Sequence, residues 1–194
     1  MRRFFCLAVL LCCGVTAVFG STGSVDPSSF KTNARFSVDN TALSLSTAVA
    51  TIEPRRGAPG YSWLRIYFYS FPVATAEVPS IENGNVEPLE KKWEKKADRP
   101  ADYNTSHAVI QLSMDSAFKV WQADMAIPGY GCTLAPFEPD VNKFLQEYRF
   151  DGKTLRLKSK GSYVCEMKPA RTFRWDIDLD IPVFRKTASN ARTR

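Results

Sequence analysis

Histidine is almost absent from this chain of 194 residues, in which His107 is the single example. Zinc sites built on several imidazoles, the two histidines of a metalloprotease helix and a His–Cys dyad are therefore excluded. A Ser-His-Asp triad would have to use His107, and no Gly-x-Ser-x-Gly segment supplies its serine. We expect no metal ion and no cofactor, and we expect His107 to begin a β-strand.

Long apolar runs are lacking after the first residues of the chain. Residues 1–20 carry two arginines, an apolar stretch and small residues before Ser21, the pattern of a secretory signal peptide. The stretch is shorter than the ~20 apolar residues of a membrane-spanning helix, so we expect no integral membrane segment after cleavage. The paired Arg2 and Arg3 leave the twin-arginine export route as an alternative. Either route predicts a secreted or periplasmic protein.

Cysteine is scarce as well. Three of the five cysteines fall within residues 1–20, so two remain in the exported part. An even pair in an oxidising compartment predicts one disulfide bond, between Cys132 and Cys165. Its closure would stabilise the fold by about 3 kcal/mol, because it restricts the unfolded chain. The alternative is a reactive thiol, but no CxxC spacing supports it.

No strong excess of one charge remains in the expected folded part. The formal charge of +6 includes Arg2 and Arg3 and the basic residues of segment 185–194, without which the chain is about neutral. A nucleic-acid groove needs clustered Lys and Arg that outweigh nearby acids, so no nucleic-acid partner is expected. We predict a signal peptide at 1–20, a single domain at 21–184 and a flexible basic tail at 185–194.

The chain is rich in two-residue alternation of apolar and charged side chains. In Thr172–Pro182, Trp175, Ile177 and Leu179 share one parity with other apolar residues, while the other parity is charged. This pattern predicts a strand with one buried and one exposed face. Residue content predicts further strands at Arg35–Val38, Leu43–Ile52, Trp63–Phe71, Ala108–Met114, Phe118–Ile127, Lys143–Phe150 and Thr154–Lys160. Asp151-Gly152 predicts a hairpin between the last two.

Seven to nine mostly antiparallel strands predict an all-β fold. We expect a β-sandwich, with a small β-barrel as the alternative. One short helix is inserted at residues 87–97, where Pro88 stands in the first turn and Trp93 lies on an apolar stripe that faces the sheet. The helix also carries Lys91, Lys92, Lys95 and Lys96. Glutamates alternate with these lysines, so i,i+4 pairs such as Glu87–Lys91 predict a solvated face.

An aromatic group is the first candidate for a ligand-binding site. Its members are Tyr61, Trp63, Tyr67, Tyr69 and Trp93. A row of aromatic rings on a sheet can stack on sugar rings. The interpretation that we favour is that this strand, with its aromatic residues up to Phe71, is the central strand of a core, with Arg65 extended along the rings.

A row of carboxylates on the last predicted strand is the second candidate. Asp176, Asp178 and Asp180 share one face and could hold Ca²⁺ with help from loops. The interpretation that we favour is a set of cross-strand ion pairs. The matching cations are Arg156, Lys158 and Lys160.

Together these features predict an exported, non-enzymatic binding or accessory module that presents its ligand at loops or on a sheet face. The expected partner is a glycan or another exported protein. One alternative is a glycan-acting enzyme in which Asp176, Asp178 or Glu147 act as paired carboxylates near Tyr67 and Tyr69. Another is a small barrel that encloses an apolar ligand.

Overall fold

The computed structural model describes residues 25–97, 107–127, 132–134, 141–165 and 170–186. Its strands are β1 (Arg35–Val38), β2 (Thr41–Leu43), β3 (Thr47–Pro54), β4 (Ser62–Tyr69), β5 (His107–Met114), β6 (Val120–Ile127), β7 (Cys132–Leu134), β8 (Glu147–Phe150), β9 (Thr154–Cys165) and β10 (Arg171–Arg185). Its helical segments are η1 (Pro27–Phe30), η2 (Thr75–Glu77), α1 (Val78–Glu82), α2 (Glu87–Ala97) and α4 (Val141–Phe144). The predicted signal peptide lies outside the described residues.

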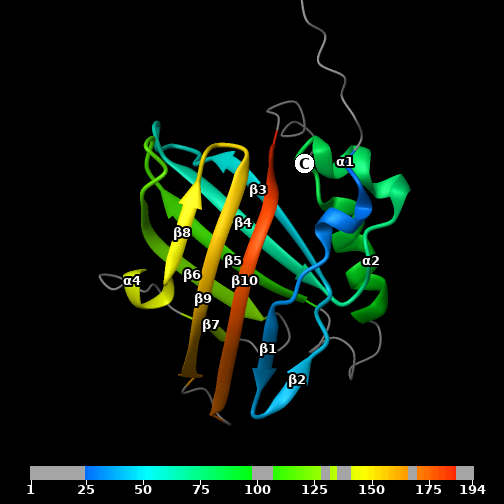
Figure 1. Ribbon diagram of the computed structural model, residues 1–194, viewed down its shortest axis with the longest axis vertical. Coiled ribbons are helices and arrows are strands. Elements are labelled where there is room, and N and C mark those ends of the chain that lie inside the picture. Colours follow the sequence, from blue (N-terminus) through cyan, green and yellow to red (C-terminus); the bar gives the residue numbers. More distant parts are fainter. Residues whose placement is uncertain (1–24, 98–106, 128–131, 135–140, 166–169, 187–194) are drawn as a thin grey trace, which may run out of the picture.

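The strands form one curled sheet in the order β2-β1-β10-β3-β4-β5-β6-β7, and β9 and β8 continue it from the other edge of β10. The first part of β10 pairs with β1, whereas Val183–Arg185 pair in parallel with β3. The opposite edge of β10 pairs with β9 from Arg171 to Pro182. The sheet therefore curls into a half-barrel, with α1 and α2 on one flank and α4 on the other (Figure 1).

The prediction of an all-β fold is confirmed in this coarse form, since the described chain is mostly strand. The predicted sandwich is not confirmed, because the described strands curl around one core and do not form two separate facing sheets. The described pairings are antiparallel except for β10 with β3. Period-two alternation reports which face of a strand is buried but not the direction of its neighbour, so the parallel pair was not predictable from it.

The main core lies on the concave side of the curled sheet. Phe173, Trp175, Ile177, Leu179 and Ile181 alternate along β10 and are all buried there. They pack with inward side chains of β1, β3 to β6 and β9. Each large apolar side chain contributes about 1.5–3 kcal/mol when it is fully buried. The predicted alternation on this strand is therefore confirmed.

A second core lies on the convex side, where η1, α1 and α2 cover the sheet. Tyr67 and Tyr69 of β4 pack there against Val78 and Ile81 of α1 and Leu89 of α2. Both faces of this part of β4 are therefore buried, and its sequence is correspondingly apolar on both parities. The predicted helix at 87–97 is confirmed residue for residue, and Trp93 packs against this core as expected.

Several predicted boundaries were wrong. The predicted strand Leu43–Ile52 is divided, because β2 ends at Leu43 and β3 begins at Thr47. In the predicted strand Lys143–Phe150, α4 precedes β8, and the helix turns the Phe144 side chain into the main core.

The predicted tail begins too early. β10 runs to Arg185, and the backbone N–H of Lys186 donates to the carbonyl of Ile52 at 3.0 Å. Charge alone does not end a strand whose backbone still has a partner. Residues 187–194 lie outside the described residues.

Candidate functional site

The predicted aromatic group is divided by the structure into a buried part and an open part. Tyr69 is fully buried beneath α2, and its ring stacks on the imidazole of His107 with 4.8 Å between centroids. Trp93 of α2 packs on the same imidazole at 4.9 Å, and Tyr67 stacks on it at 6.3 Å. These three predicted ligand-binding residues therefore form the layer between helix and sheet, in agreement with the favoured interpretation of this strand as part of a core.

Trp63 lies near the start of β4 and Tyr61 immediately precedes this strand, and both are outside the cluster that α2 covers. Tyr61 is 42% exposed and meets Trp121 of β6 edge to face at 6.3 Å. The guanidinium of Arg55 lies 5.8 Å from the Trp63 ring and 5.7 Å from the Trp121 ring. Arg65 lies over Trp63 at 5.1 Å. We call this set of five side chains the aromatic face.

Planar polar side chains continue the aromatic face across the sheet. Arg65 forms an ion pair with Glu53 and donates from Nε to Oε1 of Gln111 at 2.9 Å. On β6, Nε2 of Gln122 donates to the carboxylate of Asp124 at 3.2 Å. The register pairs Arg65 with Gln111 and Gln111 with Asp124, so these groups form one row across three strands. The rings of the aromatic face thus stand beside fixed hydrogen-bonding groups.

The sequence interpretation missed Trp121, Arg55 and Gln111. Trp121 has the same parity as Ala123 and Met125, which are buried in the main core, so alternation alone would place it inward. The register between β5 and β6 shifts at Ser113/Met114, however, and the Trp121 ring meets Tyr61. A β-bulge of this kind redirects side chains without a clear sequence signal.

The three aspartates of β10 lie opposite three cations of β9, and the ion pairs of Asp176 and Asp178 with these cations form what we call the ladder. The register pairs Asp176 with Lys160, Asp178 with Lys158 and Asp180 with Arg156. Lys160 Nζ lies 2.8 Å from Asp176, and this hydrogen bond, the largest cause, lowers the pKa of Asp176. The geometry agrees with the favoured interpretation of cross-strand ion pairs.

The ladder extends to Glu147 of β8. Arg156 lies 2.9 Å from Asp178 and 3.7 Å from Glu147, so one guanidinium stands between the two carboxylates. Lys158 contacts the same two carboxylates at 3.8 and 3.4 Å. Within the described ranges, no group of three or more His, Cys, Asp or Glu side chains is placed to hold a metal ion.

The carboxylates of the alternative enzyme interpretation are not brought together with its aromatic residues. Asp178 and Glu147 lie on the outer face of β8 to β10, among the cations of the ladder. Tyr67 and Tyr69 lie beneath α2, on a different part of the sheet. The structure therefore places the two halves of that hypothesis on separate parts of the sheet.

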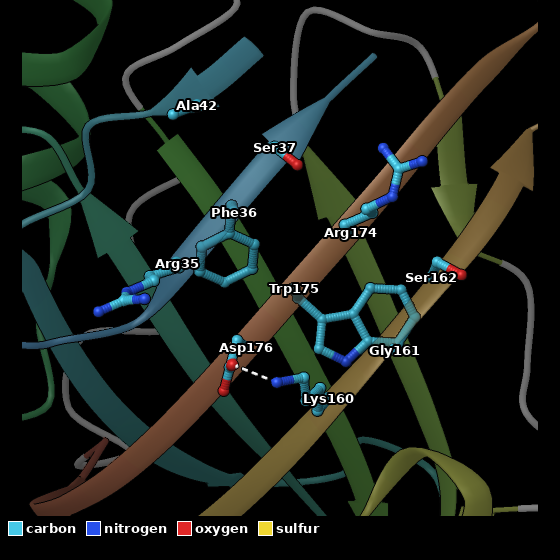
Figure 2. Close-up of a pocket in the computed structure, with 10 residues that line it drawn as sticks. All are labelled: Arg35, Phe36, Ser37, Ala42, Lys160, Gly161, Ser162, Arg174, Trp175 and Asp176. Carbon is cyan, nitrogen blue, oxygen red and sulfur yellow. Dashed lines mark hydrogen bonds and ion pairs between the residues drawn. The ribbon is translucent and has the colours of Figure 1, made fainter. Parts of the chain in front are cut away.

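A shallow groove of about 480 Å³ lies on the outer face of β1, β10 and β9 (Figure 2). Six side chains point outward around it in two rows: Arg35, Asp176 and Lys160 in one, and Ser37, Arg174 and Ser162 in the other. Ala42 of β2 extends the second row. Between these rows Phe36, Gly161 and Trp175 contribute to the floor, while the long cations form the walls.

His107 is the most unusual titratable group in the described chain. Its side chain is buried, and neither ring nitrogen has a hydrogen-bond partner among the described residues. The hydroxyl of the neighbouring Tyr69 is likewise buried without a described partner. Burial lowers the pKa of His107 to about 4. The imidazole is therefore neutral at pH 7, and its role in this structure is to pack between β4 and α2.

Two further predictions concern Lys91 and the cysteines. Lys91 Nζ lies 2.7 Å from Glu87, so the predicted i,i+4 pair is present. Cys165 is buried at the end of β9, and β7, which begins at Cys132, runs close to β9. The side chain of Cys132 lies outside the described residues, so the disulfide stays a prediction.

Comparison with known proteins assigns neither a family nor a function to the chain. No protein-family model, no curated protein and no solved structure matches the chain. Among the described helices, none has both the length and the apolar composition needed to cross a bilayer.

Proposed function

We propose that this chain is an exported, non-enzymatic binding module that holds a glycan on its aromatic face. The observation that supports this most directly is the set of partly exposed rings of Tyr61, Trp63 and Trp121 on one surface. Such rings present flat apolar surfaces, on which the C–H face of a sugar can stack. Arg55 lies near both tryptophan rings and so restricts their orientation.

The polar surroundings of the rings favour a glycan in particular. Hydroxyl groups of sugars need donors and acceptors in fixed positions, and amide and carboxylate side chains supply both. Gln111 and Arg65 are linked by a hydrogen bond, as are Gln122 and Asp124, so these groups are oriented before a ligand arrives. Orientation in advance reduces the entropy lost on binding.

A protein partner is the second candidate for the same surface. Trp, Tyr and Arg are the residues that dominate hot spots of protein interfaces, and the aromatic face consists of these three types alone. Against this candidate, Glu and Asp are depleted at such interfaces. The neighbouring Glu53 and Asp124 therefore fit a glycan better.

The proposal includes export and a disulfide. The signal-like segment at 1–20 directs the chain to an oxidising compartment, where Cys132 and Cys165 would join β7 to β9. Mass spectrometry of the secreted chain under non-reducing conditions tests both at once. A mature N-terminus near residue 21 and a tryptic peptide pair linked through the two cysteines are the expected results.

A glycan array with the mature protein tests the binding function. We expect binding of at least one neutral oligosaccharide, and Trp63→Ala should weaken it by about tenfold or more, because it removes a stacking ring (about 1.4 kcal/mol). Trp63→Phe should retain part of the affinity, since it keeps a smaller ring.

Asp178→Asn is the matched control, because Asp178 lies in the ladder outside the aromatic face. Its affinity should equal that of the unaltered protein. If the array shows no neutral oligosaccharide bound, or if Trp63→Ala binds as tightly as the control, the aromatic face is not a glycan site.

A further inference from the structure

The groove on β1, β10 and β9 lies outside the aromatic face and has an unbalanced charge. The charged side chains around it are Arg35, Lys160, Arg171, Arg174, Asp39 and Asp176. Two of the four cations are paired, Lys160 with Asp176 at 2.8 Å and Arg171 with Asp39 at 2.7 Å. Asp176 also interacts electrostatically with Arg35, and Asp39 with Arg174, but four cations against two carboxylates leave the groove with a net charge of about +2.

Arg174 is the main source of the excess positive charge. The register places it between Ser37 of β1 and Ser162 of β9, so no carboxylate faces it on its own row. Its guanidinium donates to the neutral amide oxygen of Asn40 at 2.7 Å. That hydrogen bond fixes the guanidinium in position without neutralising its charge. Figure 2 shows Arg174 on β10, with Ser37 and Ser162 on the strands to either side.

The backbone at the centre of the groove is already paired, which disfavours one common class of ligand. β10 pairs with β1 and β9, and β1 pairs in turn with β2. An extended peptide that adds a strand needs a free sheet edge, and among the described strands of the groove such an edge lies at its rim, on β2, and not over the central strand β10. The floor instead presents the hydroxyl groups of Ser37 and Ser162, which can donate to and accept from hydroxyls of a ligand.

We propose that the groove binds a polysaccharide that carries carboxylate groups. The planar guanidiniums of Arg35 and Arg174 match the geometry of a carboxylate, to which arginine can donate two parallel hydrogen bonds. The flat floor accommodates the ring of a sugar between them. This inference is independent of the aromatic face, because the two surfaces share no residue.

Polygalacturonate is the probe, with neutral dextran as the uncharged comparison, and binding is measured by calorimetry on the mature protein at two salt concentrations. We expect polygalacturonate to bind, dextran not to bind, and affinity to fall as salt rises. Arg174→Gln should lower the affinity for polygalacturonate by about tenfold or more, since a charge-assisted hydrogen bond is lost.

Arg149→Gln is the matched control, because Arg149 is an exposed cation on the same sheet but on β8, away from the groove. It removes the same unit of charge and should leave the affinity unchanged. Equal losses in the two variants would show that net charge alone attracts the polymer, which overturns the proposal. Absence of binding to polygalacturonate would overturn it as well.

The experiments distinguish a wrong assignment of the groove from a wrong assignment of the aromatic face as a glycan site. Trp63→Ala should bind polygalacturonate as the unaltered protein does, and Arg174→Gln should retain any neutral oligosaccharide found on the array. If Trp63→Ala instead abolishes binding of polygalacturonate, the acidic polymer lies on the aromatic face and the assignment to the groove is wrong.

Discussion

The indole of Trp175 occupies the space where Gly161 would carry a side chain. A β-carbon placed on Gly161 would lie 2.6 Å from Cζ2 of the indole, closer than two carbon atoms can approach. The indole is held there by its Nε1, which donates to the hydroxyl of Ser159 at 2.9 Å. That hydroxyl donates to the carbonyl of Phe144 at 2.6 Å, so α4 is tied to β9 and β10 through one buried chain of hydrogen bonds.

Gly161→Ala should therefore destabilise the fold by about 1–3 kcal/mol, the usual cost of excess volume in a packed core. Urea denaturation measures this loss. Adding Trp175→Phe to the alanine variant should recover part of it, because the smaller ring makes room for the methyl group. If the effects of the two substitutions simply add, the contact between the two residues does not constrain the structure.

Gly84 and Gly57 form a matched pair for a second stability test. Both have a positive φ, +72° and +73°, but a β-carbon on Gly84 would lie 2.5 Å from the backbone nitrogen of Lys186, whereas Gly57 has nothing within 4 Å. Both alanine variants carry the cost of a left-handed residue, about 1–2 kcal/mol. Gly84→Ala should reduce the free energy of unfolding clearly more than Gly57→Ala does, because it also pushes the turn between α1 and α2 away from the end of β10. Thermal or urea unfolding measures the difference. Equal losses would contradict this packing.

Acid should destabilise the fold through His107. The pKa of its imidazole is about 4 in the folded protein and 6.5 when the group is exposed, so the unfolded chain binds more protons between these values. Stability therefore falls as pH falls from about 6.5 to 4, by about 3 kcal/mol in total. His107→Phe keeps a ring in the stack and should remove this dependence, which urea titrations at pH 7 and 4.5 can measure.

Carboxyl groups also titrate when the protein is acidified, and their effects must be separated from that of His107. Glu90 of α2 has its pKa raised by burial, so its protonation on acidification has the opposite sign and favours the folded state. The pKa values of Asp39 and Asp176 are lowered by hydrogen bonds to Arg171 and Lys160, and their contribution is lost only below about pH 4. The informative quantity is thus the difference between the two proteins. An identical pH dependence in His107→Phe would contradict the prediction.

Asp178 tests whether the carboxylate row is a ladder or a calcium site. Asp178 is half-exposed and shares Arg156 and Lys158 with Glu147, so Asp178→Asn should cost about 1 kcal/mol or less, and less again in high salt. Calcium should not raise the melting temperature of the unaltered protein. A calcium-dependent rise that Asp178→Asn removes would instead establish a metal site.

The sequence predicted those parts of the fold that depend only on the residue pattern within a single strand or helix. The alternation in β10 and the amphipathic pattern of residues 87–97 each identify an element and its buried face, because each element has a single environment along its length. Trp63 and Tyr69 show where this fails. They share a parity on β4, yet α2 covers only Tyr69.

The groove was unpredictable for a similar reason. Arg174 lies within a charged strand pattern, and nothing in that pattern indicates that its neighbours on both sides are serines. Those neighbours are Ser37 and Ser162, which lie 137 and 12 positions away in the chain. Only the register of the two strand pairs brings them together, and register depends on turns and on tertiary packing.

β10 is the last of the described strands, and it pairs with three others, β1, β3 and β9. Until residues 171–185 have been synthesised, β1, β3 and β9 lack a common partner, and the edges of all three stay open. Open edges of this kind promote pairing with other chains. We therefore expect productive folding to follow the synthesis of residues 171–185, which is compatible with the export that we propose.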